Sequence, residues 1–182
     1  MRSQEGVLRD HLCESIMQTV IEELPVVLAD PVSKEGRSEL MWTATMAHSN
    51  MIGFEGDYAC HAVSHIFTEL FGLSHGEALA ILMPAWCCMM SSREPEFMKK
   101  FFSHVWHAEG GDDEALLWDG VKRFYRFISS CGLATTLKQA GFINVDTDRV
   151  TDKVLQGETQ FIGGGFQKLY RQDVKNLIEL CL

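Results

Sequence analysis

Three histidines gathered in one apolar stretch are the side chains most able to do chemistry in this sequence. His61, His65 and His75 lie within residues 56–84, GDYACHAVSHIFTELFGLSHGEALAILMP. His61 and His65 are four residues apart, so on a helix they share one face, one turn above the other. Neutral imidazoles are preferred ligands of Zn, Fe, Ni and Cu, and two histidines at i and i+4 commonly coordinate a metal together. The spacing indicates a metal-related site if His75 folds back toward the other two.

The same histidines also have plainer interpretations. A single histidine on an apolar face is usually a satisfied core residue. The spacing of His61 and His65 resembles the H-E-x-x-H motif of zinc metalloproteases, but Ala62 occupies the position of the essential glutamate, which argues against that class. From spacing alone, a metal site and a polar seam in a helical core both stay open.

Two further patterns carry weaker signals. The glycine run at 163–165 follows no hydrophobic strand and lacks the phosphate-loop patterns, so we interpret it as a flexible loop before the last helix. Cys60 adjoins His61, but neighbouring residues on a helix diverge by about 100°. That geometry favours a packed thiol over a nucleophile paired with a base.

Helical periodicity dominates the chain and predicts the elements that position the histidines. Apolar residues recur at three- and four-residue spacing, which predicts helices over 7–28, 33–53, 58–71, 74–90, 95–107, 112–131, 146–155 and 171–181. Gly72 suits the position after a helix end where φ is positive, and Ser74 to Glu77 has the S-x-x-E form of a capping box. This cap predicts that His75 lies in the first turn of the fourth helix and points back toward the third. The expected fold class is all-α, a single compact helical bundle.

Composition excludes several classes of function. The chain has 182 residues, of which 46% are hydrophobic, so we expect one domain with a substantial core. The formal net charge of −9 argues against nucleic acid and anionic membrane as partners. We find no apolar N-terminal signal and no apolar run of bilayer length, which predicts a soluble protein. Six cysteines without a C-x-x-C motif indicate reduced thiols in a cytoplasmic protein.

The longer stretch at 56–86, GDYACHAVSHIFTELFGLSHGEALAILMPAW, resembles the iron-containing (group III) alcohol dehydrogenases, in particular their butanol dehydrogenase-like branch. The resemblance extends upstream through LCESIMQTVIEELPVVLADP and ELMWTATMAHSNMIGF, and downstream through FFSHVWHAEG, FISSCGLATTLKQAGF and GGGFQKLYRQDVKNLIEL. It covers essentially the whole chain and concerns the C-terminal helical domain of the dehydroquinate synthase-like fold. Residues 1–182 are therefore expected to form that metal-binding helical domain.

The resemblance implies a metal site and a reaction. The family binds one divalent metal, Fe²⁺ or Zn²⁺, through an aspartate and three histidines. His61 and His75 match two of these ligands. His65 matches a histidine beside the metal and the nicotinamide, which makes it the catalytic candidate for proton relay or substrate orientation. The implied reaction is the reversible reduction of a short-chain aldehyde to an alcohol by NADH or NADPH, with the metal as a Lewis acid.

This sequence departs from the family in two ways. It contains neither a nucleotide-binding α/β domain nor the Asp-x-x-x-His pair that supplies the other two ligands, and the adjacent Asp10 and His11 do not replace that pair. The cofactor-binding residues are therefore unknown. We expect a fragment of an NAD(P)-linked alcohol dehydrogenase, inactive alone because catalytic zinc sites normally keep three protein ligands.

Other interpretations stay open. The chain could be a stand-alone helical module for binding or assembly without catalytic activity, or a metal-binding bundle of unrelated function. Apolar surface that a missing domain would cover also predicts self-association into a homo-oligomer.

Overall fold

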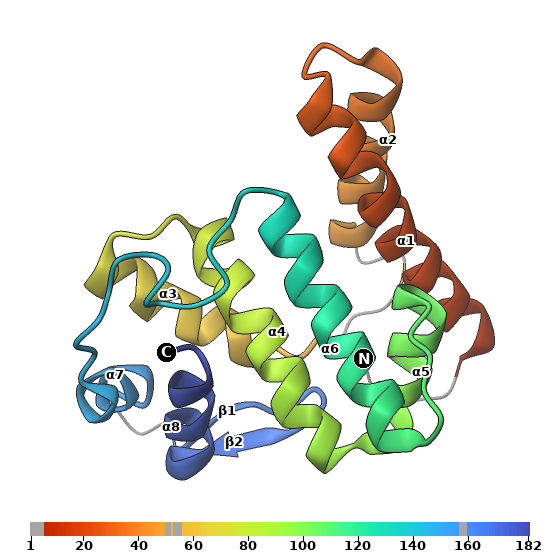
Figure 1. Cartoon of the computed structure of the whole chain (residues 1–182). Helices are drawn as coiled ribbons and strands as arrows, with labels where there is room; N and C mark the ends of the chain where they lie inside the picture. The colour runs from red at the N-terminus through yellow and green to blue at the C-terminus, as the bar shows by residue number, and fades with distance from the viewer. Residues whose placement is uncertain (1–5, 50–51, 53–55, 157–159) are drawn as a thin grey trace. The chain divides into compact units, whose positions relative to one another are not determined.

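A computed structural model of the chain describes residues 6–49, 52, 56–156 and 160–182 (Figure 1). In chain order the described elements are α1 (Val7–Ala29), α2 (Lys34–His48), α3 (Ala59–Phe71), α4 (His75–Arg93), α5 (Pro95–Trp106), α6 (Asp113–Ser130), α7 (Thr147–Val154), β1 (Phe161–Gly163), β2 (Lys168–Tyr170) and α8 (Arg171–Leu180). The all-α fold class is confirmed. Residues 50, 51 and 53, the predicted end of the second helix, lie outside the described residues.

The elements fall into two compact units. The first contains α3, α4, α7, α8 and the β1–β2 pair, and the second contains α1, α2, α5 and α6. In the first unit α4 contacts both α3 and α8. It buries side chains on all of its faces, namely Ala78, Ala80, Ile81, Leu82, Pro84, Ala85, Cys87, Met89 and Met90. A helix that is apolar all round belongs in a core, as its sequence predicted.

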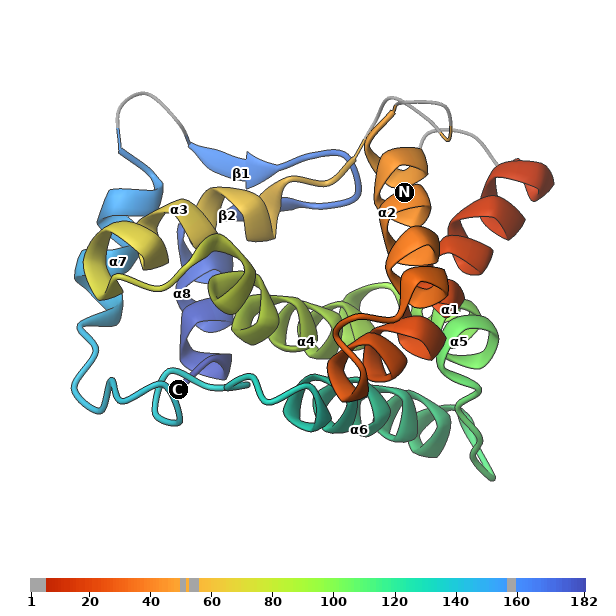
Figure 2. The same cartoon turned by 90° about the horizontal axis from the view of Figure 1, so that it is seen from above.

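A small hairpin in the first unit corrects the interpretation of the glycine run at 163–165. β1 and β2 pair antiparallel, with Phe161 opposite Tyr170 and Gly163 opposite Lys168. The run therefore closes β1 and forms the turn, rather than a flexible loop. Gly163 has a φ of 75°, a conformation that favours glycine. The hairpin lies beside α3 (Figure 2), so it flanks the helix that carries His61 and His65.

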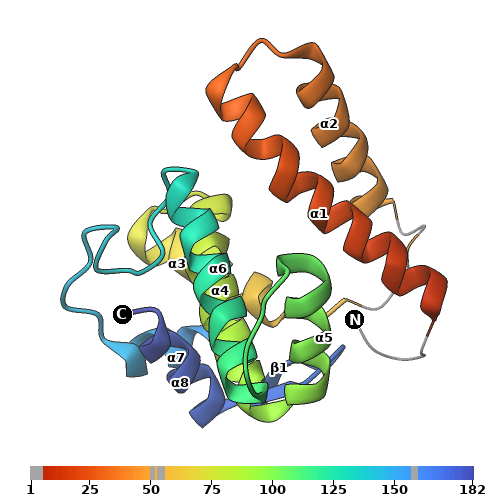
Figure 3. The ribbon, with the colours of Figure 1, turned by 45° about the vertical axis from the view of Figure 1, so that its right-hand side comes forward.

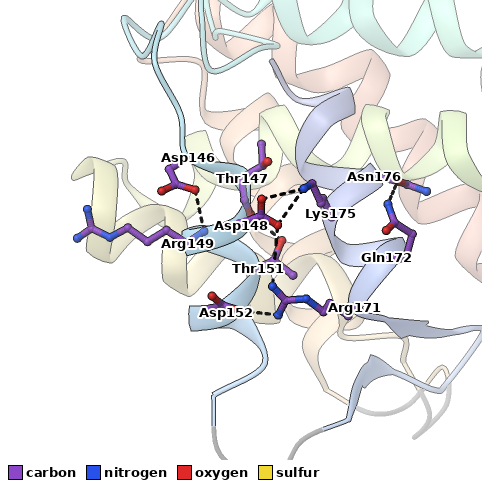
Figure 4. Close-up of polar contacts among 10 residues, drawn as sticks. All are labelled: Asp146, Thr147, Asp148, Arg149, Thr151, Asp152, Arg171, Gln172, Lys175 and Asn176. Atoms are coloured by element: carbon purple, nitrogen blue, oxygen red, sulfur yellow. Dashed lines mark hydrogen bonds and ion pairs between the residues drawn. The ribbon is translucent and has the colours of Figure 1, made fainter.

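Charged side chains join α7 to α8 in the first unit (Figure 4). Lys175 on α8 donates to both carboxylate oxygens of Asp148 on α7, at 2.8 and 2.9 Å. Arg171 at the start of α8 pairs with Asp152, one turn along α7. A helix of eight residues is marginal by itself, so these pairs help to hold α7 in place.

Acid should remove the Asp148–Lys175 contribution to stability. The hydrogen bond from Lys175, followed by its charge and that of Arg171, lowers the pKa of Asp148 below its ordinary value of 3.8. Because the folded-state pKa lies below the unfolded one, the stabilisation is present above the unfolded value and is lost as pH falls through the folded value. We expect Lys175→Gln to lower the denaturation midpoint at neutral pH, with the difference from wild type shrinking below about pH 4. Exposed Lys138→Gln is the control, and a difference that does not shrink in acid would contradict the prediction.

The second unit contains the α1–α2 pair and the α5–α6 pair (Figure 3). α1 buries none of its side chains, and polar side-chain pairs join it to α5. Glu14 lies 2.9 Å from Nδ1 of His104, and Lys100 donates to Asp10 at 2.7 Å. Asp10 is therefore engaged in a structural ion pair. α5 and α6 meet through aromatic rings, with Trp106 stacked on Phe124 at a centroid distance of 4.6 Å.

Two further expectations concern the membrane and the cysteines. Among the described helices, none combines the length and apolar character that crossing a bilayer requires. The six cysteines form no disulfide with one another in the structure, and Cys60, Cys87 and Cys181 are buried.

Candidate functional site

The junction between α3 and α4 brings the third histidine back toward the other two. Gly72 ends α3 with a φ of 68°, and its N–H bonds the carbonyl of Thr68. Ser74 and Glu77 then form the predicted capping box: the Ser74 N–H donates to Glu77 at 2.8 Å, and the Glu77 N–H donates to Ser74 Oγ at 3.3 Å. The chain reverses within three residues, and His75 is the first residue of α4. It therefore lies in the first turn, as the sequence predicted.

The three imidazoles converge at this junction. The ring centroid of His61 lies 4.5 Å from that of His65 and 4.9 Å from that of His75. The rings of His65 and His75 are stacked at 5.6 Å. Nε2 of His65 and Nε2 of His61 are 3.0 Å apart, a hydrogen-bond distance. All three side chains are exposed, so the cluster is open to a ligand and is not a polar seam in the core.

The surroundings of His61 favour its neutral form. Desolvation of the ring by its neighbours, followed by repulsion from charge on His65 and His75, lowers the pKa of His61 from its ordinary value. A metal binds the neutral imidazole and competes with the proton for its nitrogen. His61 therefore stays neutral at lower pH than an isolated histidine would.

The cluster is not a complete metal cage. Within the described ranges, no group of three or more His, Cys, Asp or Glu side chains is arranged to hold a metal ion. His61 and His75 fit the chemistry of Fe²⁺ or Zn²⁺ as neutral nitrogen donors, but a catalytic site of this kind normally has three protein ligands.

Two buried residues near His61 on α3, Cys60 and Ser64, differ in their contacts. Cys60 is 6% exposed, and burial raises its pKa well above the ordinary value, so the interpretation as a packed thiol is confirmed. Ser64, which we did not single out in the sequence, is fully buried; its Oγ lies 2.7 Å from the carbonyl of His61 and 3.0 Å from Nδ1 of His75. Its place on α3 beside His61 could have been predicted, but its contact with His75 depends on how α4 packs.

Comparison with known proteins identifies the family. Residues 3–182 match the profile described as Fe-containing alcohol dehydrogenase family, C-terminal. The chain belongs to this family. It is 30% identical over 178 residues to the probable NADH-dependent butanol dehydrogenase 1 of Bacillus subtilis, covering 96% of this chain and 45% of that protein. It is 29% identical over 140 residues to the NADPH-dependent aldehyde reductase YqhD of Escherichia coli, covering 75% and 36%.

Solved structures of the family share the fold. An NADH-dependent butanol dehydrogenase A from Thermotoga maritima superposes with a TM-score of 0.87 at 26% identity, covering 98% of this chain and 47% of that one. The substrate- and cofactor-free aldehyde reductase YqhD of E. coli gives a TM-score of 0.91 at 23% identity, covering 100% and 48%. The chain thus spans about half the length of the iron-type dehydrogenases that it matches.

Proposed function

We propose that this chain supplies the metal-binding and substrate-side helical domain, over residues 1–182, of a metal-dependent NAD(P)-linked alcohol dehydrogenase or aldehyde reductase. The convergence of His61, His65 and His75 at the α3–α4 junction, in a chain of this family, carries the proposal. The relatives named above use NADH or NADPH and are butanol dehydrogenases or aldehyde reductases. A short-chain alcohol or aldehyde is accordingly the proposed substrate.

His61 and His75 are the proposed ligands of a divalent metal, Fe²⁺ or Zn²⁺. Such a metal supplies a Lewis acid that polarises a carbonyl or alkoxide oxygen. Two observations support the assignment: the lowered pKa of His61, and the first-turn position of His75 opposite His61 across the junction. Further ligands would have to come from elsewhere in the complete enzyme.

His65 is the proposed catalytic residue on the substrate side. Its ring is exposed, and its Nε2 shares a hydrogen bond with Nε2 of His61. A histidine side chain can serve as a general acid or base toward a bound substrate. It would thus hold the proton that an alkoxide gains when an aldehyde is reduced.

The proposal predicts selective loss of metal binding from two histidine variants. His61→Ala and His75→Ala should each lower Zn²⁺ affinity by more than about tenfold, because loss of a ligand should cost at least as much as loss of an outer-shell partner, which costs about 10–100-fold. Isothermal titration of the full chain with Zn²⁺ measures this. His11→Ala, an exposed histidine on α1, is the matched control. Equal affinities of wild type and both variants would exclude these ligands.

Catalysis is proposed to need the rest of the enzyme. The glycine run at 163–165 is the end of β1 and a hairpin turn, which does not fit a dinucleotide phosphate loop. Supplied with Fe²⁺ or Zn²⁺, an aldehyde and either NADH or NADPH, the purified chain should show no loss of nicotinamide absorbance. Clear turnover would show that the chain is catalytically active by itself, which would contradict the proposal that catalysis needs the rest of the enzyme.

A second candidate function is a helical assembly module without catalysis. It is favoured by large apolar side chains that α1 and α2 expose, including Leu8, Met41 and Trp42, each at least 65% exposed. Such side chains often mark interaction surfaces. A chain that self-associates with rising concentration and binds no Zn²⁺ would favour this candidate over the dehydrogenase domain.

A further inference from the structure

Ser64 sits directly beneath the histidine cluster and touches two of its members. It is fully buried on α3, three residues after His61 and one before His65. Its Oγ is 2.7 Å from the backbone carbonyl oxygen of His61 and 3.0 Å from Nδ1 of His75. Both distances are within the range of good hydrogen bonds. One hydroxyl therefore joins the helix carrying His61 to the ring of His75.

The single hydroxyl proton of Ser64 can serve only one of these two contacts as a donor. A carbonyl oxygen accepts hydrogen bonds and never donates one, so the 2.7 Å contact requires that Ser64 donates to His61. The Oγ then has only lone pairs for the second contact. Consequently Nδ1 of His75 must carry a proton and donate it to Ser64.

We propose that Ser64 is a positioning residue that holds His75 as its Nδ1–H tautomer. In a neutral ring with a proton on Nδ1, Nε2 carries the lone pair. His75 would therefore bind a metal through Nε2, with its ring orientation fixed by the buried hydroxyl. Hydrogen bonds to the second nitrogen of a ligating histidine fix the tautomer and the ring orientation in this way. The role in metal binding rests on the proposed function, whereas the tautomer follows from the contacts alone.

Nitrogen-15 NMR of the wild-type chain tests the tautomer without any metal. At about pH 8, above the ordinary pKa of imidazole, an unprotonated ring nitrogen resonates far downfield of a protonated one. We expect the protonated nitrogen of His75 to be Nδ1, with Nε2 at the downfield position. A His75 ring with its proton on Nε2 would overturn the inference, whatever the chain does with metals.

A pair of variants tests whether Ser64 is the cause. Ser64→Ala should shift His75 toward the Nε2–H tautomer and lower Zn²⁺ affinity by about tenfold, the lower end of the effect of losing such a partner. Ser64→Thr retains a hydroxyl that can bond the same helix carbonyl and should restore both properties. Ser91→Ala is the matched control, because Ser91 Oγ also donates to a backbone carbonyl of its own helix, that of Cys87 on α4.

The outcomes separate this inference from the proposed function. If His75 has the Nδ1–H tautomer in wild type and loses it in Ser64→Ala, the inference is supported even if wild type binds no Zn²⁺. Absence of Zn²⁺ binding would count against the proposed metal site instead. A second outcome would overturn the inference and leave the metal site intact. In that outcome Zn²⁺ binding depends on His75, but Ser64→Ala changes neither the Zn²⁺ affinity nor the tautomer of His75. If the alanine variant fails to fold, the wild-type spectrum alone decides.

Discussion

Replacement of Gly120 by alanine is expected to destabilise the second unit by about 3 kcal/mol, at the upper end of the cost of overpacking a core. Gly120 lies in α6 directly against the ring of Phe102 on α5, which is fully buried. A Cβ at Gly120 would lie 2.1 Å from Cγ of Phe102 and 2.5 Å from its Cβ. Carbon atoms pack best at about 3.5–4.0 Å, so either the helices must separate or the ring must leave its rotamer.

Thermal unfolding followed by circular dichroism measures the effect. For a chain of this size, 3 kcal/mol corresponds to a fall of about 10 °C in the unfolding midpoint. Gly76→Ala is the control, because a Cβ at Gly76 in the first turn of α4 would meet nothing within 4 Å. That substitution should be neutral or stabilising by up to about 1 kcal/mol.

A smaller residue at position 102 should relieve the clash. Phe102→Leu alone loses packing, but combined with Gly120→Ala it should cost less than the sum of the two single changes. A Gly120→Ala midpoint within about 2 °C of wild type, or strict additivity in the double variant, would show that this contact does not limit the packing of α5 on α6.

The sequence predicted the helices because their signals are local. The cap formed by Ser74 and Glu77 and the left-handed residue at Gly72 both depend on contacts within four residues. These two features also predicted that His75 lies in the first turn of α4 and points back toward α3. Local rules therefore indicated that the third histidine could approach the other two, which is the central feature of the candidate site.

The contacts that complete the site could not be predicted in the same way. The bond between Ser64 and His75 joins residues eleven positions apart, and it depends on how the first turn of α4 packs against α3. Nothing in the spacing distinguishes Ser64 from an ordinary serine within a helix. The roles of His61, His65 and His75 came from the family resemblance and stay predictions.

The hairpin was missed for a related reason. Its strands have three residues each, which is too short for an alternating pattern to be recognised. It is also held by a residue far away in the sequence. Asp57, just before α3, accepts hydrogen bonds from the N–H groups of Phe166 and Gln167 at 3.0 and 3.3 Å, more than a hundred positions along the chain.

Asp57→Ala is therefore expected to detach the hairpin from the start of α3, at a cost of about 3 kcal/mol. The carboxylate accepts three backbone N–H bonds, the third from Ala59 at 2.9 Å. Hydrogen bonds to a charged group contribute about 1.5–3 kcal/mol each, and they overlap here because they share one side chain. Chemical denaturation measures the loss. Asp112→Ala, which removes a carboxylate that caps α6 through one N–H bond, is the control and should cost about 1 kcal/mol.

A steric change on the other side of the same contact should have the same consequence. A Cβ at Gly165 would lie 2.4 Å from the carbonyl oxygen of Gly56 and 2.9 Å from the backbone nitrogen of Asp57. Since both atoms belong to the backbone, Gly165→Ala should push the turn away. We expect it to weaken hydrogen-exchange protection at the Phe166 and Gln167 amides, and we expect the same of Asp57→Ala. Protection lost in the Asp57 variant but retained in Gly165→Ala would mean that the carboxylate holds the turn without close backbone approach. Protection retained in both would contradict the prediction, and the hairpin would then have to be held by its own strands and by α8.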